Sequence, residues 1–197
     1  MRWDNLFDDL ESQLEQEIGA EDLDLLAEEE RLRLGRLSLR DRLRAMMPTT
    51  SADEPLRLLL VDGTRIAVDL GAVGRDWIAG EVCGDGIRLP SCVIPIAAIA
   101  GCLLAATQSV ASVNTASEAG VGTLAARLGL AFVLRDLCRR RASVHILTAA
   151  GMLHGTIDRV GRDHLDLAEH EPGVPRRDRA IRVMRLLPVS ELVLVRF

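Results

Sequence analysis

Histidines and aspartates gather near the carboxyl end, and these residue types suit metal binding. The set lies between residues 154 and 170 and comprises His154, Asp158, Asp163, His164, Asp166 and His170. Imidazole nitrogens and carboxylates are common ligands of transition metals. From His164 to Leu167, however, polar and apolar residues alternate, as they do in a strand with one face in solvent. The sequence therefore favours a solvated strand face over a metal site.

Other patterns that carry chemistry are weaker. The chain has four cysteines without a C-x-x-C spacing, Cys83, Cys92, Cys102 and Cys138, and three of them lie in or beside apolar runs. Such cysteines behave as small buried hydrophobes. The glycine-rich run Gly71–Gly74 is not followed by a helical pattern, so it is not a phosphate-binding loop. No nucleophile and base stand out, and we expect no metal, no cofactor and no enzymatic activity.

Clustered arginines are the main indication of nucleic-acid binding. All 24 basic residues are arginine, and the candidate phosphate contacts are Arg139, Arg140, Arg141, Arg176, Arg177 and Arg179. Arginines neutralise phosphates and make binding sensitive to salt. The first three also form the end of a predicted helix, and the carboxyl end of a helix favours positive charge. Aromatic stacking residues are scarce, and Trp77 is the only candidate within the predicted modules.

An acidic arm opens the chain. Residues 1–30 hold twelve acids and one arginine, a charge of −11, so residues 31–197 carry +6 of the net −5. Apolar residues recur at three- and four-residue steps, which predicts one stripe of an amphipathic helix: Trp3, Phe7, Leu10, Leu14 and Ile18. A second helix is predicted over Glu21–Leu34 and a third over Leu39–Met47. The arm either packs on the body as a helical hairpin or docks on a partner, and both alternatives stay open.

A repeat organises the rest of the chain. The stretches Asp62–Ala79 and Ala150–Leu167 share one pattern, in which a glycine opens an apolar run and a Val-Gly-Arg-Asp tetrad follows. The tetrads are Val73–Asp76 and Val160–Asp163. Downstream, Ile94–Ile99 reads like Leu187–Leu192, with a proline second in each. The sequence therefore contains two copies of one module.

Each module has the pattern of five short strands. In the first, strands are predicted over 58–61, 64–70, 77–83 and 87–94, with a tight turn at Asp62-Gly63 and a proline-led turn before Ile99. Gly155 in the second module is expected where its second strand bends, because a small barrel needs a corner without a side chain. Between the modules, residues 105–122 lack a firm period and are expected to be a flexible crossover. A helix is predicted over Thr123–Arg141.

These modules resemble SH3-like barrels, and specifically Sm-like domains. Residues similar to the first Sm motif are Gly151, Gly155-Thr156-Ile157, Val160, Asp163 and Leu165-Asp166-Leu167. Sm domains that bind RNA carry an asparagine near the position of Asp166, and their second motif has an Arg-Gly or Lys-His pair where this chain has Arg185–Pro188. The start MRWDNLFDDLE and the paired VGRDW and VGRDH motifs also resemble an uncharacterised family of small proteins from high-GC bacteria.

The sequence thus predicts a mainly β protein with helical additions (α+β), containing two separate five-stranded SH3-like barrels. The predicted parts are an acidic helical arm (1–50), a first barrel (55–104), a crossover with a connecting helix (105–141) and a second barrel (142–197).

We expect a cytoplasmic, non-enzymatic adaptor that binds another protein, with candidate contacts at Trp3, Phe7, Leu10, Leu14 and Trp77. The alternative is an Sm-like factor that binds RNA or DNA weakly. No membrane-spanning segment or secretory signal is expected, because the acidic amino end is not followed by an apolar stretch long enough for either. Self-association is left open.

Overall fold

A computed structural model gives the fold of the chain. The residues that the structure describes are 25–84, 87–114, 124–174 and 176–197. Contacts divide the chain into a unit of residues 1–38 and a larger unit of residues 39–197. In the smaller unit, residues 25–35 form a helix. The predicted stripe of Trp3, Phe7, Leu10 and Leu14 lies outside the described residues.

The larger unit begins with helix α2 (Leu39–Met46), followed by a 3-10 turn, η1 (Met47–Thr49). Leu43 and Met46 lie on one face of α2 and are fully buried against the strands that follow. The predicted arm extended to residue 50. Because α2 contributes to the core of the strands, residues 39–50 belong with the sheet and not with the arm.

The first module, residues 56–103, forms five strands as the alternation predicts. They are β1 (Leu56–Leu60), β2 (Arg65–Val73), β3 (Trp77–Gly84), β4 (Ile87–Pro95) and β5 (Ile99–Leu103). At the Asp62-Gly63 turn, Gly63 has a φ of 86°, a left-handed conformation that glycine adopts without strain. A 3-10 turn, η2 (Ile96–Ala98), follows Pro95 and separates β4 from β5.

The second module, residues 143–196, repeats this order. Its strands are β6 (Ser143–Thr148), β7 (Gly151–Val160), β8 (His164–Glu169), β9 (Val183–Pro188) and β10 (Leu192–Arg196). Two 3-10 turns lie among them, η3 (Asp178–Ala180) before β9 and η4 (Val189–Glu191) after Pro188. Within each module, the fifth strand pairs with the first and the other four pair in chain order.

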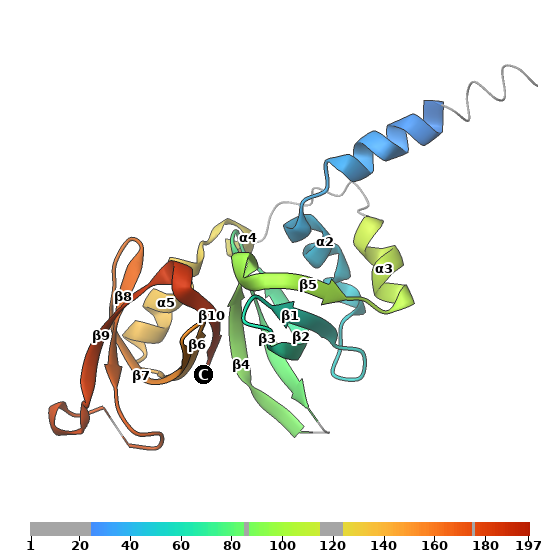
Figure 1. The fold of residues 1–197 in the computed structure, drawn as a ribbon. Helices are drawn as coiled ribbons and strands as arrows, with labels where there is room; N and C mark the ends of the chain where they lie inside the picture. The colour runs from blue at the N-terminus through green and yellow to red at the C-terminus, as the bar shows by residue number, and fades with distance from the viewer. Residues whose placement is uncertain (1–24, 85–86, 115–123, 175) are drawn as a thin grey trace, which may run out of the picture. The chain divides into compact units, whose positions relative to one another are not determined.

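The two modules are joined in one sheet, so the prediction of two separate barrels is wrong. All ten strands form one antiparallel sheet in the order β5-β1-β2-β3-β4-β10-β6-β7-β8-β9. The junction is the pairing of β4 with β10, which lie side by side in Figure 1. Pairing satisfies backbone groups that would otherwise form an exposed strand edge, which explains why the modules merge there.

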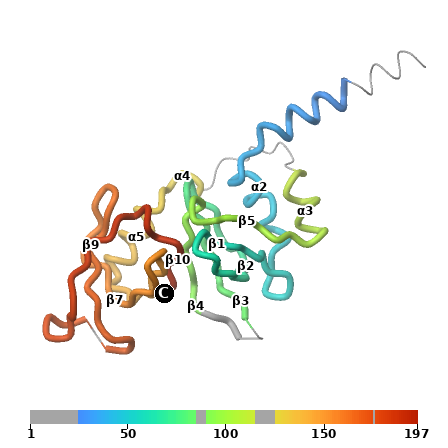
Figure 2. The backbone as a smooth tube through the Cα atoms, in the orientation of Figure 1, coloured from blue at the N-terminus to red at the C-terminus, as the bar shows by residue number. Residues whose placement is uncertain are grey.

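Strands at the junction contribute to two hydrophobic cores. The first core lies in the first module, yet it contains Val193 and Leu194 of β10. The second core lies in the second module, yet it contains Trp77 of β3 and Val93 of β4. In Figure 2 the chain's C-terminus lies beside β4, and Phe197 donates its N–H to the Ser91 carbonyl at 3.0 Å. Each core is therefore completed by the other module.

The connection between the modules is more helical than predicted. Residues Ala106–Val113 form helix α3, in a stretch that was expected to be a flexible crossover. The buried Gln108 explains this helix: its Oε1 accepts the N–H of Ala105 at 3.1 Å, and its Nε2 donates to the carbonyl of Glu54 at 3.1 Å. The predicted helix over 123–141 appears as α4 (Leu124–Arg127) and α5 (Leu130–Arg139).

Candidate partner-binding and nucleic-acid-binding surfaces

The described part of the arm carries exposed leucines. In the helix of residues 25–35, Leu25 is 63% exposed, Leu26 is 61% exposed and Leu32 is 53% exposed. Leu25 and Leu32 are seven residues apart and lie on the same side of the helix. Acidic and basic side chains pair along the helix, with Arg33 Nε at 2.6 Å from Glu30 Oε2. The helix therefore presents an apolar stripe beside charged side chains.

Trp77 is a core residue, so it is not available as the partner contact that the sequence predicts. Its side chain is only 6% exposed and belongs to the second core. The indole Nε1 donates to the carbonyl of Leu128 at 3.0 Å, so the one polar atom of the ring is satisfied inside the protein. A buried tryptophan with a satisfied N–H cannot stack on a base or contact a partner without unfolding this region.

Arg139 is the last residue of helix α5 and Arg140 follows it, and the two share one carboxylate. Arg140 Nε lies 2.7 Å from Asp136 Oδ2, and Arg139 pairs with Asp136 Oδ1. Both arginines stay largely exposed, at 78% and 70% of the side chain. One acid thus offsets part of the charge of this cluster, and the arginines also suit the negative end of the helix.

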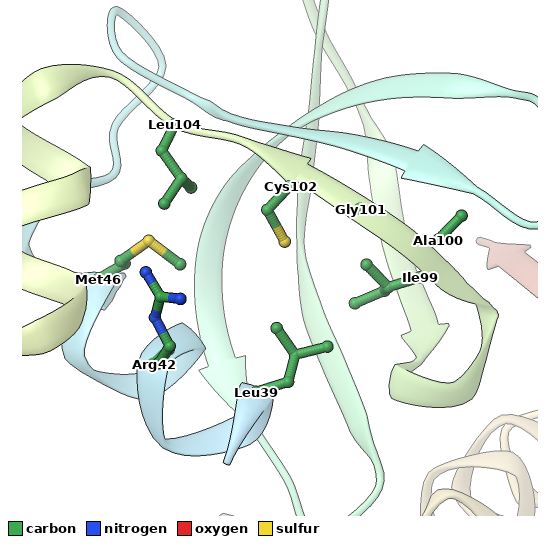
Figure 3. A pocket seen from close by; sticks show the side chains of 8 residues that line it. All are labelled: Leu39, Arg42, Met46, Ile99, Ala100, Gly101, Cys102 and Leu104. Carbon is green, nitrogen blue, oxygen red and sulfur yellow. The ribbon is translucent and has the colours of Figure 1, made fainter. Parts of the chain in front are cut away.

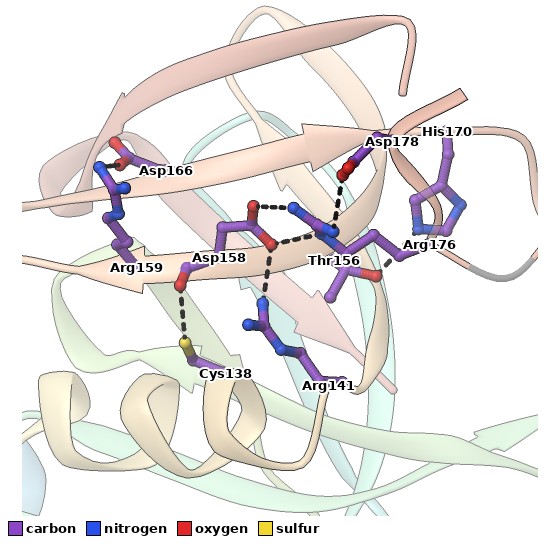
Figure 4. A network of polar contacts seen from close by, with 9 residues as sticks. All are labelled: Cys138, Arg141, Thr156, Asp158, Arg159, Asp166, His170, Arg176 and Asp178. Carbon is purple, nitrogen blue, oxygen red and sulfur yellow. Dashed lines mark hydrogen bonds and ion pairs between the residues drawn. The ribbon is translucent and has the colours of Figure 1, made fainter. Parts of the chain in front are cut away.

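Arg141 and Arg176 converge on Asp158, as Figure 4 shows. Arg176 binds both carboxylate oxygens, with Nε at 2.7 Å from Oδ1 and Nη2 at 2.6 Å from Oδ2. Arg141 Nη1 lies 2.9 Å from Oδ1. The hydrogen bonds from Arg176 and the nearby positive charges hold the pKa of Asp158 below its usual value. Asp158 therefore neutralises two of the arginines that the sequence predicts as phosphate contacts.

The remaining two candidate arginines lie in the loop before β9. Arg177 and Arg179 are both exposed, and neither forms an ion pair within the part of the chain that the structure describes. Of the six predicted phosphate contacts, four are thus engaged with Asp136 or Asp158, and two keep their charge open to solvent. This arrangement is a sparse positive surface.

A hollow of about 400 Å³ lies beside the Asp158 network. Its lining consists of Arg141, Ser143, Thr156, His170, Val174 and Arg176. His170 is 4% exposed, and both ring nitrogens have partners: Nε2 lies 2.9 Å from Thr156 Oγ1 and Nδ1 lies 3.0 Å from the Glu171 carbonyl. Because its polar groups are already paired, the hollow has the chemistry of a structural network and not of an anion cradle.

The structure does not assemble the candidate histidines and aspartates into a metal site, although the ring centroids of His154 and His170 lie 5.2 Å apart. His154 Nδ1 faces His145 Nδ1 at 3.4 Å, and burial together with the neighbouring imidazoles lowers the pKa of His154. His164 Nδ1 instead lies 2.8 Å from Asp163 Oδ1 at the surface. Among the described residues, no group of three or more His, Cys, Asp or Glu side chains is arranged to hold a metal.

Strand β8 has the alternation that its sequence predicts. Leu165 and Leu167 are fully buried, while His164 is exposed and Asp166 is partly exposed.

The cysteines are all free, and burial raises the pKa of the Cys92 thiol to about 11. A thiol with such a pKa is protonated at neutral pH and unreactive.

Sequence reasoning missed an apolar row on β9. Val183 is 50% exposed, Met184 is 52% exposed and Leu186 is 67% exposed. The strand pairs with β8 on one side and ends the sheet on the other. The sequence does indicate this surface. A strand with one solvated face alternates polar and apolar residues, but β9 has apolar residues on both faces: Val183, Met184, Leu186 and Leu187.

No helix among the described residues is long and apolar enough to span a membrane. In comparisons with known proteins, no family model, no curated protein and no solved structure matches the chain.

Proposed function

We propose that this protein is a non-enzymatic adaptor that binds another protein through its acidic arm. The observation that carries the proposal is the exposed stripe of Leu25 and Leu32 on the helix of residues 25–35. An amphipathic helix with such a stripe suits docking into an apolar groove. The charge of −11 over residues 1–30 favours a partner whose groove is rimmed by basic side chains.

The charge distribution of the larger unit supports protein over nucleic acid as the partner. Arg141 and Arg176 pair with Asp158, and Arg139 and Arg140 pair with Asp136. Trp77, the aromatic residue proposed for stacking, is buried. The acidic arm would also repel a phosphate backbone.

The alternative function is weak binding of RNA or DNA by an Sm-like module. The exposed Arg177 and Arg179 are the observation that favours it. The resemblance to Sm-like domains belongs to this proposal as well, whereas the resemblance to a family from high-GC bacteria implies no activity. Its binding would weaken steeply as salt rises.

Charged substitutions on the arm test the adaptor proposal in the full chain. The double variant Leu25→Glu, Leu32→Glu is expected to lose partner capture from native lysate, because it places charges on the docking stripe. Its melting temperature is expected to stay near that of the wild type, since both side chains are exposed. Capture by the wild type is expected to survive nuclease treatment and a rise from about 0.1 M to about 0.5 M salt.

Val61→Glu is the matched control. Val61 is 57% exposed and lies in the turn after β1, so this variant adds one surface carboxylate without touching the arm. It is expected to capture the partner as the wild type does. Capture that disappears with nuclease, or that falls by orders of magnitude over the same salt range, would support the nucleic-acid alternative instead.

A further inference from the structure

Among the residues that the structure describes, the sheet ends in two strands that each have one unpaired edge. In this part of the chain β5 pairs with β1 alone and β9 pairs with β8 alone, so they form the two ends of the ten-strand order. An unpaired edge presents backbone N–H and C=O groups that can pair with another strand. The apolar row on β9 lies along one of these edges.

The two end strands are the repeat counterparts of the strands that already pair at the junction. Pro95 of the first module corresponds to Pro188 of the second, an offset of 93 residues. By this offset β9 is the counterpart of β4, and β5 is the counterpart of β10. The chain therefore contains one β4–β10 junction and, at its two ends, one further copy of each partner.

The junction gives the register for such a pairing. Val93 lies opposite Val195 and Cys92 opposite Arg196, while Phe197 donates its N–H to the Ser91 carbonyl at 3.0 Å. Val93 is 1% exposed and Val195 is fully buried. Applying the offset, Leu186 is the counterpart of Val93 and Cys102 is the counterpart of Val195. Leu186, in contrast to Val93, is 67% exposed.

The Val-Gly-Arg-Asp loop of the first module also binds across the junction. Asp76 Oδ1 accepts the N–H of Leu130 at 2.7 Å, and Arg75 donates its N–H to the Leu128 carbonyl at 3.0 Å. These bonds hold the start of helix α5, the helix that precedes β6. The counterpart loop of the second module is exposed at Arg162 and Asp163.

The two loops have the same internal geometry. Gly74 donates its N–H to the Trp77 carbonyl at 2.8 Å, and Gly161 donates to the His164 carbonyl at 2.8 Å. In each loop the ring of the later residue lies over the glycine, where a Cβ would meet ring atoms at 2.2 Å in one case and 2.5 Å in the other. The second loop is thus built like the one that binds α5.

A hollow lies beside β5, where a side chain of an added strand would enter. It has a volume of about 260 Å³ and is lined by α2 and β5, with Leu39, Arg42, Met46 and Cys102 among its residues (Figure 3). The buried Nε of Arg42 has no hydrogen-bond partner in the described chain. The side chains that line the hollow are apolar apart from the Arg42 guanidinium and the Cys102 thiol, and the hollow is large enough to accept a leucine side chain.

The corresponding place in the second module is filled. Helix α5 is the counterpart of α2, because each precedes the first strand of a module and each contains Leu-Arg-Asp, at Leu39–Asp41 and at Leu134–Asp136. Leu134 of α5 and Val93 of β4 lie together in the second core. Val93 therefore lies between α5 and β10. Leu186 of an added strand would lie in the equivalent position between α2 and β5.

We propose that two copies of this chain associate head to tail, with β9 of one copy pairing antiparallel to β5 of the next. In this interface Leu186 lies opposite Cys102 of the second copy and its side chain enters the hollow between α2 and β5. The interface joins two different surfaces, so it is heterologous and leaves each dimer with one free edge of either kind. The proposal does not rest on the adaptor function, which concerns the arm.

A cysteine at position 186 tests the register directly. In the full-length Leu186→Cys variant, mild oxidation is expected to yield dimers and larger species linked between the thiol at position 186 and the native Cys102. Antiparallel partners that exchange hydrogen bonds have Cα atoms about 5.5 Å apart, within the range that a disulfide spans. Peptide mapping by mass spectrometry identifies the linked pair among the other cysteines.

Matched variants make the result decisive. Leu186→Cys combined with Cys102→Ala is expected to lose the link, and Ser190→Cys, at an exposed position off the register, is expected to form none. The wild type is expected to gain mass with concentration above the 21.5 kDa monomer in sedimentation, whereas Leu186→Arg stays monomeric. A link between two thiols at position 186, which indicates a two-fold dimer, would overturn the proposal. So would a wild type that remains monomeric at all concentrations.

Discussion

Removing residues 192–197 is expected to unfold the whole of residues 39–197 and not the second module alone. Strand β10 places Val193 and Leu194 in the first core and Leu192 and Val195 in the second. Burying one such side chain contributes about 1.5 to 3 kcal/mol, so the four together contribute roughly 6 to 12 kcal/mol. That range approaches the entire stability of a typical domain. Circular dichroism and thermal melting measure the effect.

Removing Phe197 alone is the control for this truncation. Phe197 is 40% exposed, and its loss removes mainly the hydrogen bond to Ser91, worth about 1 kcal/mol. This shorter deletion is expected to leave the fold intact with a slightly lower melting temperature. If the chain without residues 192–197 keeps a cooperative transition from the first module, the shared-core account is wrong.

Gly155→Val is expected to lower the free energy of unfolding by an amount near the upper end of the range of about 1 to 3 kcal/mol. A Cβ at position 155 would lie 2.2 Å from the backbone oxygen of Ala168 and 2.9 Å from its carbonyl carbon. Backbone atoms of a central strand pair cannot move aside as a flexible side chain can, so β7 and β8 must separate locally. Denaturant unfolding of the full chain measures the loss.

Gly101→Val tests whether the effect at Gly155 comes from the close approach or from the loss of a strand glycine. A Cβ at position 101 has no atom within 4 Å, and the residue also lies in a strand. This variant is expected to change stability by less than about 0.5 kcal/mol. Equal losses in the two variants would remove the steric explanation for Gly155.

The strands of both modules were predictable because their signals are local. The turn at Asp62-Gly63 and the prolines at 95 and 188 mark chain reversals, and the alternation on either side sets which face is buried. The same alternation correctly predicted the solvent side of β8. These features depend on neighbouring residues, which a single sequence shows directly.

Pairing between β4 and β10 was not predictable in the same way. Val93 and Val195 are 102 residues apart, and apolar residues at those positions fit a barrel core as well as a junction. Trp77 raised the same ambiguity: an aromatic residue after a polar tetrad reads equally as surface or core until its partner Leu128 is known. Helix α3 depends on Gln108 reaching Glu54, a tertiary contact with no local signature.

The contacts of the candidate site residues were less predictable than the strands. The sequence shows the arginine clusters directly, but it does not show that Asp136 of α5 and Asp158 of β7 pair with them. The exposed row on β9 was overlooked because apolar residues in a strand normally indicate a core. That these residues form an interaction surface is indicated only by comparing the buried Val93 with its exposed counterpart Leu186.

The continuous sheet depends on the pairing of β4 with β10, and a disulfide across this pair tests it most directly. Val93→Cys combined with Val195→Cys places two thiols at directly opposite positions in the second core. Oxidation of the full chain is expected to form a link within one molecule, identified by peptide mapping, and to raise the melting temperature because it closes a loop of 102 residues. Failure of this pair to link within one molecule, under oxidation that links an exposed control pair, would contradict the continuous sheet.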